Sequence, residues 1–301
     1  MITMKKILFP TDYSEYAEQA FIYAVDLARR FQAELHILHA IVNYSYAGYF
    51  SPDQENLYKN LRKNAEYLTE DLVEKYQISD LKVEKLYFPA LSASSMIIDY
   101  ANQFQASLIV MGTHSRQGLS HLVLGSVAEN VIRTATCPVL TIGKGMAMDR
   151  DSKLIKNILV PIDFSSHSKQ LLSYAMDLAK NYQAKLQILH VIDTPVYPAF
   201  YVMDQIAFTS VAENIKTRVV ENLNSLVNEL KEPSVETEIF AVEGRAAKTI
   251  AEFAEENDND LILIATHGLT GVERFLLGSV TEKVVRLAKT PVFTVKPKEN
   301  N

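Results

Sequence analysis

Short apolar runs alternate along the chain with longer segments whose apolar residues recur every three or four positions. The runs are typical of buried strands, and the longer segments are typical of amphipathic helices. The strands predicted in the first half are 6–11, 34–42, 82–88, 106–111 and 138–142. The helices predicted between them begin at Ser14 and then cover 51–77, 94–105 and 127–135. Regular alternation of this kind predicts an α/β fold with a parallel sheet and helices on both faces.

The longest predicted helix, 51–77, has an apolar face that should pack on the sheet. This face is formed by Leu57, Leu61, Ala65, Leu68 and Leu72.

The pattern then restarts, so the chain contains an internal repeat. The segment 156–163 repeats 5–12, and Pro291 repeats Pro138, at a nearly constant spacing of 151 to 153 residues. A repeat of this length predicts two copies of one whole domain and not a short solenoid unit. We therefore expect domains at 1–145 and 154–298, joined by a polar linker at 143–153.

Composition excludes several classes of protein. The chain has 301 residues, is 48% hydrophobic and 22% charged, and carries a net charge of −6 without a basic block, so nucleic acid is not an expected partner. No apolar run approaches the roughly 20 residues of a membrane span, and the first apolar run is too short for a signal peptide. The single cysteine, Cys137, allows no intramolecular disulfide. These features predict a cytoplasmic protein that does not enter the membrane.

The chemistry of the sequence is concentrated in a loop between the fourth strand and the following helix, at 112–126, which recurs at 265–279. The glycine and serine at its end fall where the helix should begin. The first backbone N–H groups of a helix lack partners and lie at the positive end of the helix dipole. With glycine allowing close approach, this arrangement is a phosphate site. The alternative is a glycine-rich turn with a serine cap.

The two loops share a spacing of Gly, two residues, Gly, nine residues, Gly and Ser. The key positions are Gly112, Ser115, Gly125 and Ser126 in the first copy, and Ala265, Gly268, Gly278 and Ser279 in the second. Neither loop has a lysine just before the helix, so neither is a P-loop. Phosphate would be held mainly by backbone N–H groups.

An aspartate ends the first strand of each copy, Asp12 and Asp163. Ligands of open parallel sheets bind beyond the carboxyl ends of the strands, where a carboxylate accepts hydrogen bonds from ribose hydroxyls. The alternative is an aspartate that caps the next helix, and the duplication favours the ligand role.

No nucleophile paired with a base and no cluster at metal-ligand spacing stands out, so we predict no catalytic residue and no structural metal. His114 and His267 occupy the same place in each loop, where a structural role is favoured over contact with phosphate. A core or rim role is expected for His39 and His190, which end the second strand of each copy.

At these residues the chain resembles the universal stress protein family, over nearly its whole length and as two tandem domains. The resemblance rests on Pro-Thr-Asp12 and Pro-Ile-Asp163, the two loops, Gly-Ser-Val-Ala-Glu129 and Gly-Ser-Val-Thr-Glu282, and Cys-Pro-Val139 and Thr-Pro-Val292. It implies two Rossmann-like domains of the adenine nucleotide alpha hydrolase type, each with a five-stranded parallel sheet of order 3-2-1-4-5. It also implies pairing of domains through their fifth strands, which here would form a pseudo-dimer within one chain, with a homodimer as a further expectation.

In one branch of that family the domain binds ATP, to which Mg²⁺ can be attached. The resemblance implies that Asp12 or Asp163 and Gly112 or Ala265 contact ribose, and that the main chain of Ala40 or Val191 contacts adenine. The later loop positions would take the phosphates. Ser115 departs from glycine, whereas Ala265 adds only a methyl group, so we expect tighter binding in the second copy.

Three functions follow as hypotheses. The first is an adenine-nucleotide-binding stress protein that acts as a sensor or regulator and not as an enzyme. The alternatives are a weak ATPase or phosphotransferase, and an interaction scaffold with degenerate nucleotide sites.

Overall fold

The computed structural model describes residues 4–42, 52–113, 124–143, 155–193, 205–230, 234–266 and 277–296. Two compact units divide the chain near residue 148, and we call them the N-terminal and C-terminal units. Each is described by itself below.

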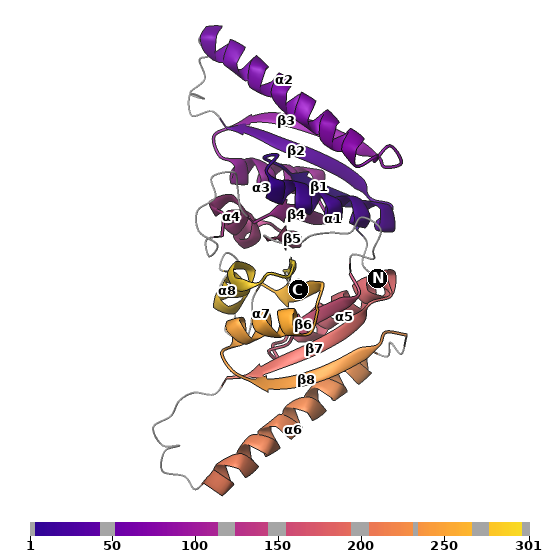
Figure 1. Ribbon diagram of the computed structural model, residues 1–301, viewed down its shortest axis with the longest axis vertical. Coiled ribbons are helices and arrows are strands. Elements are labelled where there is room, and N and C mark those ends of the chain that lie inside the picture. The colour runs from indigo at the N-terminus through magenta and orange to yellow at the C-terminus, as the bar shows by residue number, and fades with distance from the viewer. Residues whose placement is uncertain are drawn as a thin grey trace. The chain divides into compact units, whose positions relative to one another are not determined.

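The N-terminal unit is an α/β domain with a parallel sheet of order β3-β2-β1-β4-β5 (Figure 1). Its elements are β1 (Lys6–Pro10), α1 (Glu15–Phe31), β2 (Glu34–Val42), α2 (Pro52–Lys75), β3 (Val83–Ala90), α3 (Ala93–Phe104), β4 (Leu108–Gly112), α4 (Ser126–Thr134) and β5 (Val139–Ile142). The strand order confirms the predicted 3-2-1-4-5 arrangement, and the element bounds differ from the predicted ones by at most two residues.

The C-terminal unit repeats this topology, with a parallel sheet of order β8-β7-β6-β9-β10. Figure 1 labels the three neighbouring strands β6, β7 and β8 of this sheet. Its elements are β6 (Asn157–Pro161), α5 (Ser168–Tyr182), β7 (Lys185–Ile192), α6 (Gln205–Glu229), β8 (Thr237–Glu243), α7 (Ala246–Glu256), β9 (Leu261–Ala265), α8 (Ser279–Leu287) and β10 (Val292–Val295). The two tandem Rossmann-like domains expected from the repeat are therefore present.

Helices cover both faces of the N-terminal sheet. The ring of Phe9 in β1 lies 5.0 Å from that of Phe21 in α1, and Phe9 is level with Ile37 in β2. The next β2 side chain toward the amino end, His36, stacks on Phe104 of α3 with ring centroids 3.6 Å apart. Because neighbouring side chains of a strand point to opposite faces, α1 and α3 lie on opposite sides of the sheet.

The first half of α2 departs from the prediction of a buried apolar face. Ala65 and Leu72 are buried, but Leu57 and Leu61 are 51% and 41% exposed. A helix of 24 residues is about 36 Å long, whereas β3, with eight residues, is about 26 Å long. The prediction is wrong for this half because α2 is longer than β3, the neighbouring strand.

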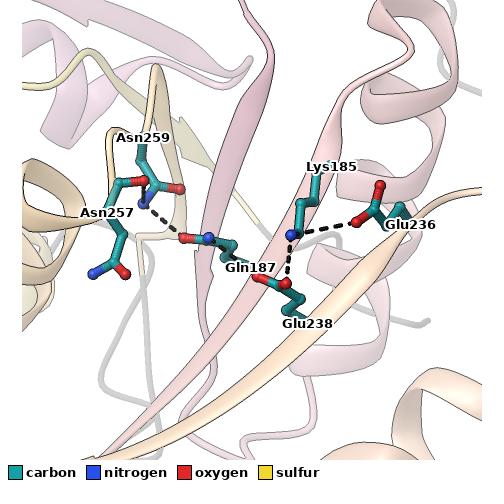
Figure 2. A network of polar contacts seen from close by, with 6 residues as sticks. All are labelled: Lys185, Gln187, Glu236, Glu238, Asn257 and Asn259. Atoms are coloured by element: carbon teal, nitrogen blue, oxygen red, sulfur yellow. Dashed lines mark hydrogen bonds and ion pairs between the residues drawn. The ribbon is translucent and has the colours of Figure 1, made fainter.

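The start of the C-terminal sheet, at the end opposite the strand carboxyl ends, holds a polar network that Figure 2 shows. Lys185 forms ion pairs with Glu238 and, at 3.3 Å, with Glu236. The buried Asn259 amide donates to Gln187 Oε1 at 2.9 Å.

The corresponding place in the N-terminal unit carries the reverse charges. There Glu34 begins β2, and Lys82 lies 2.8 Å from its carboxylate. Both repeats therefore have an ion pair at this place, but the acidic and the basic residue are exchanged between the two positions.

Candidate functional site

The turn after β1 places Asp12 directly before α1. Its Oδ1 accepts a hydrogen bond from the Ser14 N–H at 3.0 Å, and the Ser14 hydroxyl oxygen accepts from the Ala17 N–H at 3.2 Å. Ser14 is therefore the helix cap and Asp12 shapes the turn before it. The alternative that Asp12 itself caps the helix is therefore not what the structure shows, because Ser14 has that role.

The same turn follows β6. Oδ1 of Asp163 accepts from the Ser165 N–H at 3.0 Å and from the Ser168 hydroxyl at 3.4 Å. Here α5 begins only at Ser168, and no side chain caps it. The aspartate thus has the same local role in both units, although the helix beginning differs.

A residue that the sequence reasoning missed follows each aspartate. Tyr13 and Phe164 both have φ 58°, in the left-handed region that bulky side chains rarely adopt. The five other non-glycine residues with positive φ in the described chain lie at or just beyond helix ends. An aromatic residue after the aspartate in both copies was the signal available in the sequence.

A histidine at the end of the second strand holds each of these turns. Nδ1 of His39 lies 2.8 Å from the Thr11 carbonyl oxygen, and its ring centroid is 4.8 Å from that of Tyr13. Nδ1 of His190 lies 2.7 Å from the Ile162 carbonyl oxygen in the same way. Because a carbonyl oxygen only accepts, Nδ1 carries the proton in each histidine. The histidines thus tie the first two strands together beside the aspartate.

Gly112, at the end of β4, makes room for α1. A Cβ at this position would lie 2.9 Å from the carbonyl carbon of Tyr16 and 3.1 Å from the nitrogen of Ala17. The counterpart in the C-terminal unit is Ala265, and there the helix begins later relative to the aspartate. Close packing of helix on strand is therefore a physical reason for glycine at 112, in addition to the ribose contact that the resemblance implies.

The loop after β4 is closed at its ends by backbone hydrogen bonds. The Gly125 N–H donates to the Thr113 carbonyl oxygen at 2.8 Å, and the Gly278 N–H donates to the Thr266 carbonyl oxygen at the same distance. The parts of the loops between these ends, with Ser115, His114, Gly268 and His267, lie outside the described residues. The predictions made for those four residues stay predictions.

The helix after the closed loop is expected to begin with N–H groups that lack partners. The first intrahelical bond runs from the Glu129 N–H to the Gly125 carbonyl oxygen at 2.9 Å, and no side chain caps α4. Among the described residues, no hydrogen-bond partner is found for the N–H groups of Ser126, Val127 and Ala128. Since the Gly125 N–H is already used, these three groups are the donors that an anion would meet.

A cavity of about 250 Å³ joins these parts in the N-terminal unit. It is lined by Pro10, Thr11, Asp12, Ala17, Leu38, His39, Ala40, Val42, Ala93, Ile97, Met111, Gly112, Thr113, Gly125, Ser126, Val127 and Ala128. The structure thus brings together all the described residues predicted to form the first site, since Asp12 and the first residues of α4 line the same cavity. Most of the remaining described lining is apolar, and no lysine or arginine is among these described residues.

In the C-terminal unit the predicted residues take the equivalent places. Asp163 follows β6, Val191 lies near the end of β7, Ala265 ends β9, and Gly278 and Ser279 begin α8. The hydroxyl of Thr281 donates to the Ala265 carbonyl oxygen at 2.7 Å, where the N-terminal unit has Ala128. This part of the second site is therefore more polar than the first.

Two features of the described residues bear on other classes of function. Within that part of the chain, no three His, Cys, Asp or Glu side chains are grouped so that they could hold a metal ion. None of the helices described here has the length and apolarity needed to cross a membrane.

Comparison with known proteins identifies both units. The model of the universal stress protein family matches residues 3–143 and 154–296. A universal stress protein of Methanocaldococcus jannaschii is 35% identical over 143 residues, which cover 48% of this chain and 83% of that protein. The crystal structure of a universal stress protein from Archaeoglobus fulgidus has a TM-score of 0.66 at 22% identity, covering 98% of this chain and 99% of that one. The chain therefore belongs to the universal stress protein family and contains two tandem copies of its domain.

Proposed function

We propose that this protein binds adenine nucleotide, with ATP as the preferred ligand, and that it works in the cytoplasm as a sensor or regulator in the stress response. The observation that carries the proposal is that one cavity is lined both by Asp12 and by the start of α4, where three N–H groups have no partner among the described residues. A nucleotide has hydroxyls to donate to the first and an anionic phosphate to accept from the second.

The lining divides the ligand among three parts of the site. The apolar lining beside Ala40 suits a flat base, whose edge would meet the main chain at the end of β2. Asp12 would accept from the ribose hydroxyls, and the N–H groups of 126–128 would donate to the phosphates. Each charge-assisted hydrogen bond contributes about 1.5–3 kcal/mol, and the helix dipole contributes about 0.3–1 kcal/mol. Because the described lining has no lysine or arginine, backbone donors would provide most of the phosphate affinity.

The C-terminal unit is proposed to hold a second site of the same kind, formed by Asp163, Val191, Ala265, Gly268, Gly278 and Ser279. Mg²⁺ would enter either site only together with the triphosphate. The proposed domain bounds are 1–145 and 154–298.

Substitution of Ser126 by proline tests the phosphate contacts. Proline is tolerated at the first position of a helix, and Gly125 before it has φ −61° and ψ 137°, which is the conformation that a residue before proline prefers. Ser126→Pro therefore removes one N–H donor and the hydroxyl without disturbing α4. Ser126→Ala is the matched control, because it removes only the hydroxyl.

Calorimetry with ATP, AMP and adenosine on the full chain separates the roles. We expect Ser126→Pro to weaken ATP binding about tenfold and to leave adenosine binding unchanged, whereas Asp12→Ala should weaken both. A Ser126→Pro protein that bound ATP as the wild type does would contradict the proposed phosphate contacts. Loss of adenosine binding in the same variant would show that the substitution had disturbed the whole site.

A further inference from the structure

The hydroxyl of Tyr13 connects the turn beside the nucleotide site to the long helix α2. It donates to the Ala65 carbonyl oxygen at 3.0 Å and lies 2.9 Å from the hydroxyl oxygen of Thr69. Thr69 is fully buried, and its hydroxyl also bonds the Ala65 carbonyl oxygen at 2.9 Å. A residue adjacent to Asp12 is therefore anchored in the middle of α2.

Tyr13 is held in an unfavourable backbone conformation by its surroundings. Its φ is 58°, its N–H donates to the Thr11 hydroxyl oxygen at 3.0 Å, and its ring lies against His39. A non-glycine residue keeps such a conformation only where neighbouring contacts determine it. The same contacts surround the aspartate that is proposed to hold ribose, so a shift of Tyr13 would also move Asp12.

The C-terminal unit shows that the turn itself does not require the hydroxyl. Phe164 has the same φ of 58°, and its ring lies 4.7 Å from that of His190. The same number of residues separates the end of α2 from β3 and the end of α6 from β8. Positions in the two helices can therefore be matched by counting back from their ends, and Leu223 then corresponds to Thr69. Leu223 is fully buried, like Thr69. Both partners of the polar contact are thus apolar in the second unit, while the turn is unchanged.

The second half of α2 is the part that packs against the rest of the unit. Leu57 and Leu61 in the first half are exposed, whereas Ala65, Thr69 and Leu72 in the second half are buried. The Tyr13 contacts therefore fall on the part of the helix that is anchored to the sheet.

We propose that α2 and the nucleotide site of the N-terminal unit are coupled through the Tyr13 hydroxyl, so that Tyr13 is a positioning residue for Asp12. The inference rests on the proposed nucleotide binding. Binding of ATP fixes the turn and thereby makes α2 detach from the sheet less often. Because coupling between two sites is reciprocal, detachment of α2 lowers the affinity for ATP by the same factor by which ATP opposes detachment. The C-terminal unit lacks this coupling.

Tyr13→Phe in the full chain tests the coupling, because it removes only the hydroxyl and Phe164 shows that the turn accepts phenylalanine. Two quantities are measured: the Kd for ATP by calorimetry, and the hydrogen exchange of α2 amides in 65–75 with and without ATP. In the wild type we expect ATP to slow this exchange. In Tyr13→Phe we expect ATP to bind roughly three- to tenfold more weakly, as for one lost hydrogen bond, and exchange in α2 to respond to ATP much less.

Two further variants show whether the effect passes through the contact. Thr69→Val removes the hydroxyl on the helix side but leaves the Tyr13 hydroxyl its bond to the Ala65 carbonyl oxygen, so it should give part of the Tyr13→Phe effect. The double variant should bind ATP no more weakly than Tyr13→Phe. Phe164→Tyr is the control in the C-terminal unit and should change neither quantity, since it has no hydroxyl to meet at Leu223.

The outcomes separate this inference from the proposed function. If the wild type bound no ATP, the proposed function would fail and the coupling with it. If the wild type bound ATP, and Tyr13→Phe bound it within twofold and kept the full response of α2 exchange, the coupling alone would be overturned. If the losses of ATP-binding free energy in the two single variants added up in the double variant, Tyr13 and Thr69 would act independently and the coupling would likewise be overturned.

Discussion

A single methyl group at Gly112 should disturb the first turn of α1. The Cβ introduced by Gly112→Ala would meet three backbone atoms, the carbonyl carbon and oxygen of Tyr16 at 2.9 and 3.0 Å and the nitrogen of Ala17 at 3.1 Å. Backbone in a helix cannot rotate away as a flexible side chain can. The helix beginning must therefore shift, together with Ser14 and the turn that carries Asp12.

The magnitude follows from two opposing terms. Forcing an extra methyl group into packed structure costs about 1–3 kcal/mol. Replacing glycine by alanine recovers about 0.4–1 kcal/mol, because the unfolded chain loses freedom. We therefore expect Gly112→Ala to lower the free energy of unfolding by about 1–2 kcal/mol and to weaken ATP binding about tenfold.

Urea unfolding and calorimetry of the full chain measure the two effects. Ala265→Gly is the reciprocal control, and it should cost only about 0.5–1 kcal/mol, the usual effect of glycine in regular structure, without changing ATP binding. If Gly112→Ala unfolded and bound ATP like the wild type, α1 would not pack on β4 as described, and glycine at 112 would have no packing role.

Four further expectations concern other parts of the molecule. The hydrogen bond from Lys82 and the contact with His36 hold the pKa of Glu34 below its usual range. Its contribution to stability should therefore be complete above about pH 4.5 and be lost as the pH falls through the lowered pKa, and a pH series of urea unfolding should show less of this loss in Lys82→Met. Gln187→Ala should cost about 1–3 kcal/mol in urea unfolding, because it leaves the buried Asn259 amide group only its longer contact, at 3.5 Å, with the Asn257 carbonyl oxygen. The strands β5 and β10 should pair antiparallel, which cross-strand NOEs would show; their absence would count against the pseudo-dimer. Titration of the separated domains should give the lower Kd for the C-terminal one, which keeps glycine where the N-terminal loop has serine, and equal Kd values would refute this.

Much of the fold could be predicted because its signals are local. The apolar runs gave the strands, and Gly125-Ser126 marked the start of α4, since the chemistry of helix ends is confined to a few residues. The order of the strands came from the resemblance to the family. Element ends moved by one or two residues because hydrogen bonds and not composition decide them.

The features that could not be predicted depend on tertiary contacts. The packing role of Gly112 depends on where α1 crosses β4. The left-handed conformation of Tyr13 depends on the hydrogen bond from the Ser14 N–H to Asp12 and on the ring of His39. The exposure of Leu57 depends on how far α2 extends along the sheet. A periodic pattern shows that a helix has an apolar face, but not how much of that face meets a partner.

The central claim is that this chain binds adenine nucleotide, and nucleotide content tests it most directly. The full chain is saturated with ATP, desalted and acid-denatured, and the released nucleotide is identified and counted by chromatography. We predict between one and two molecules of adenine nucleotide per chain, with the C-terminal site filled first, and about one molecule per chain in Asp12→Ala. Less than about a tenth of a molecule per chain in the wild type would contradict the account.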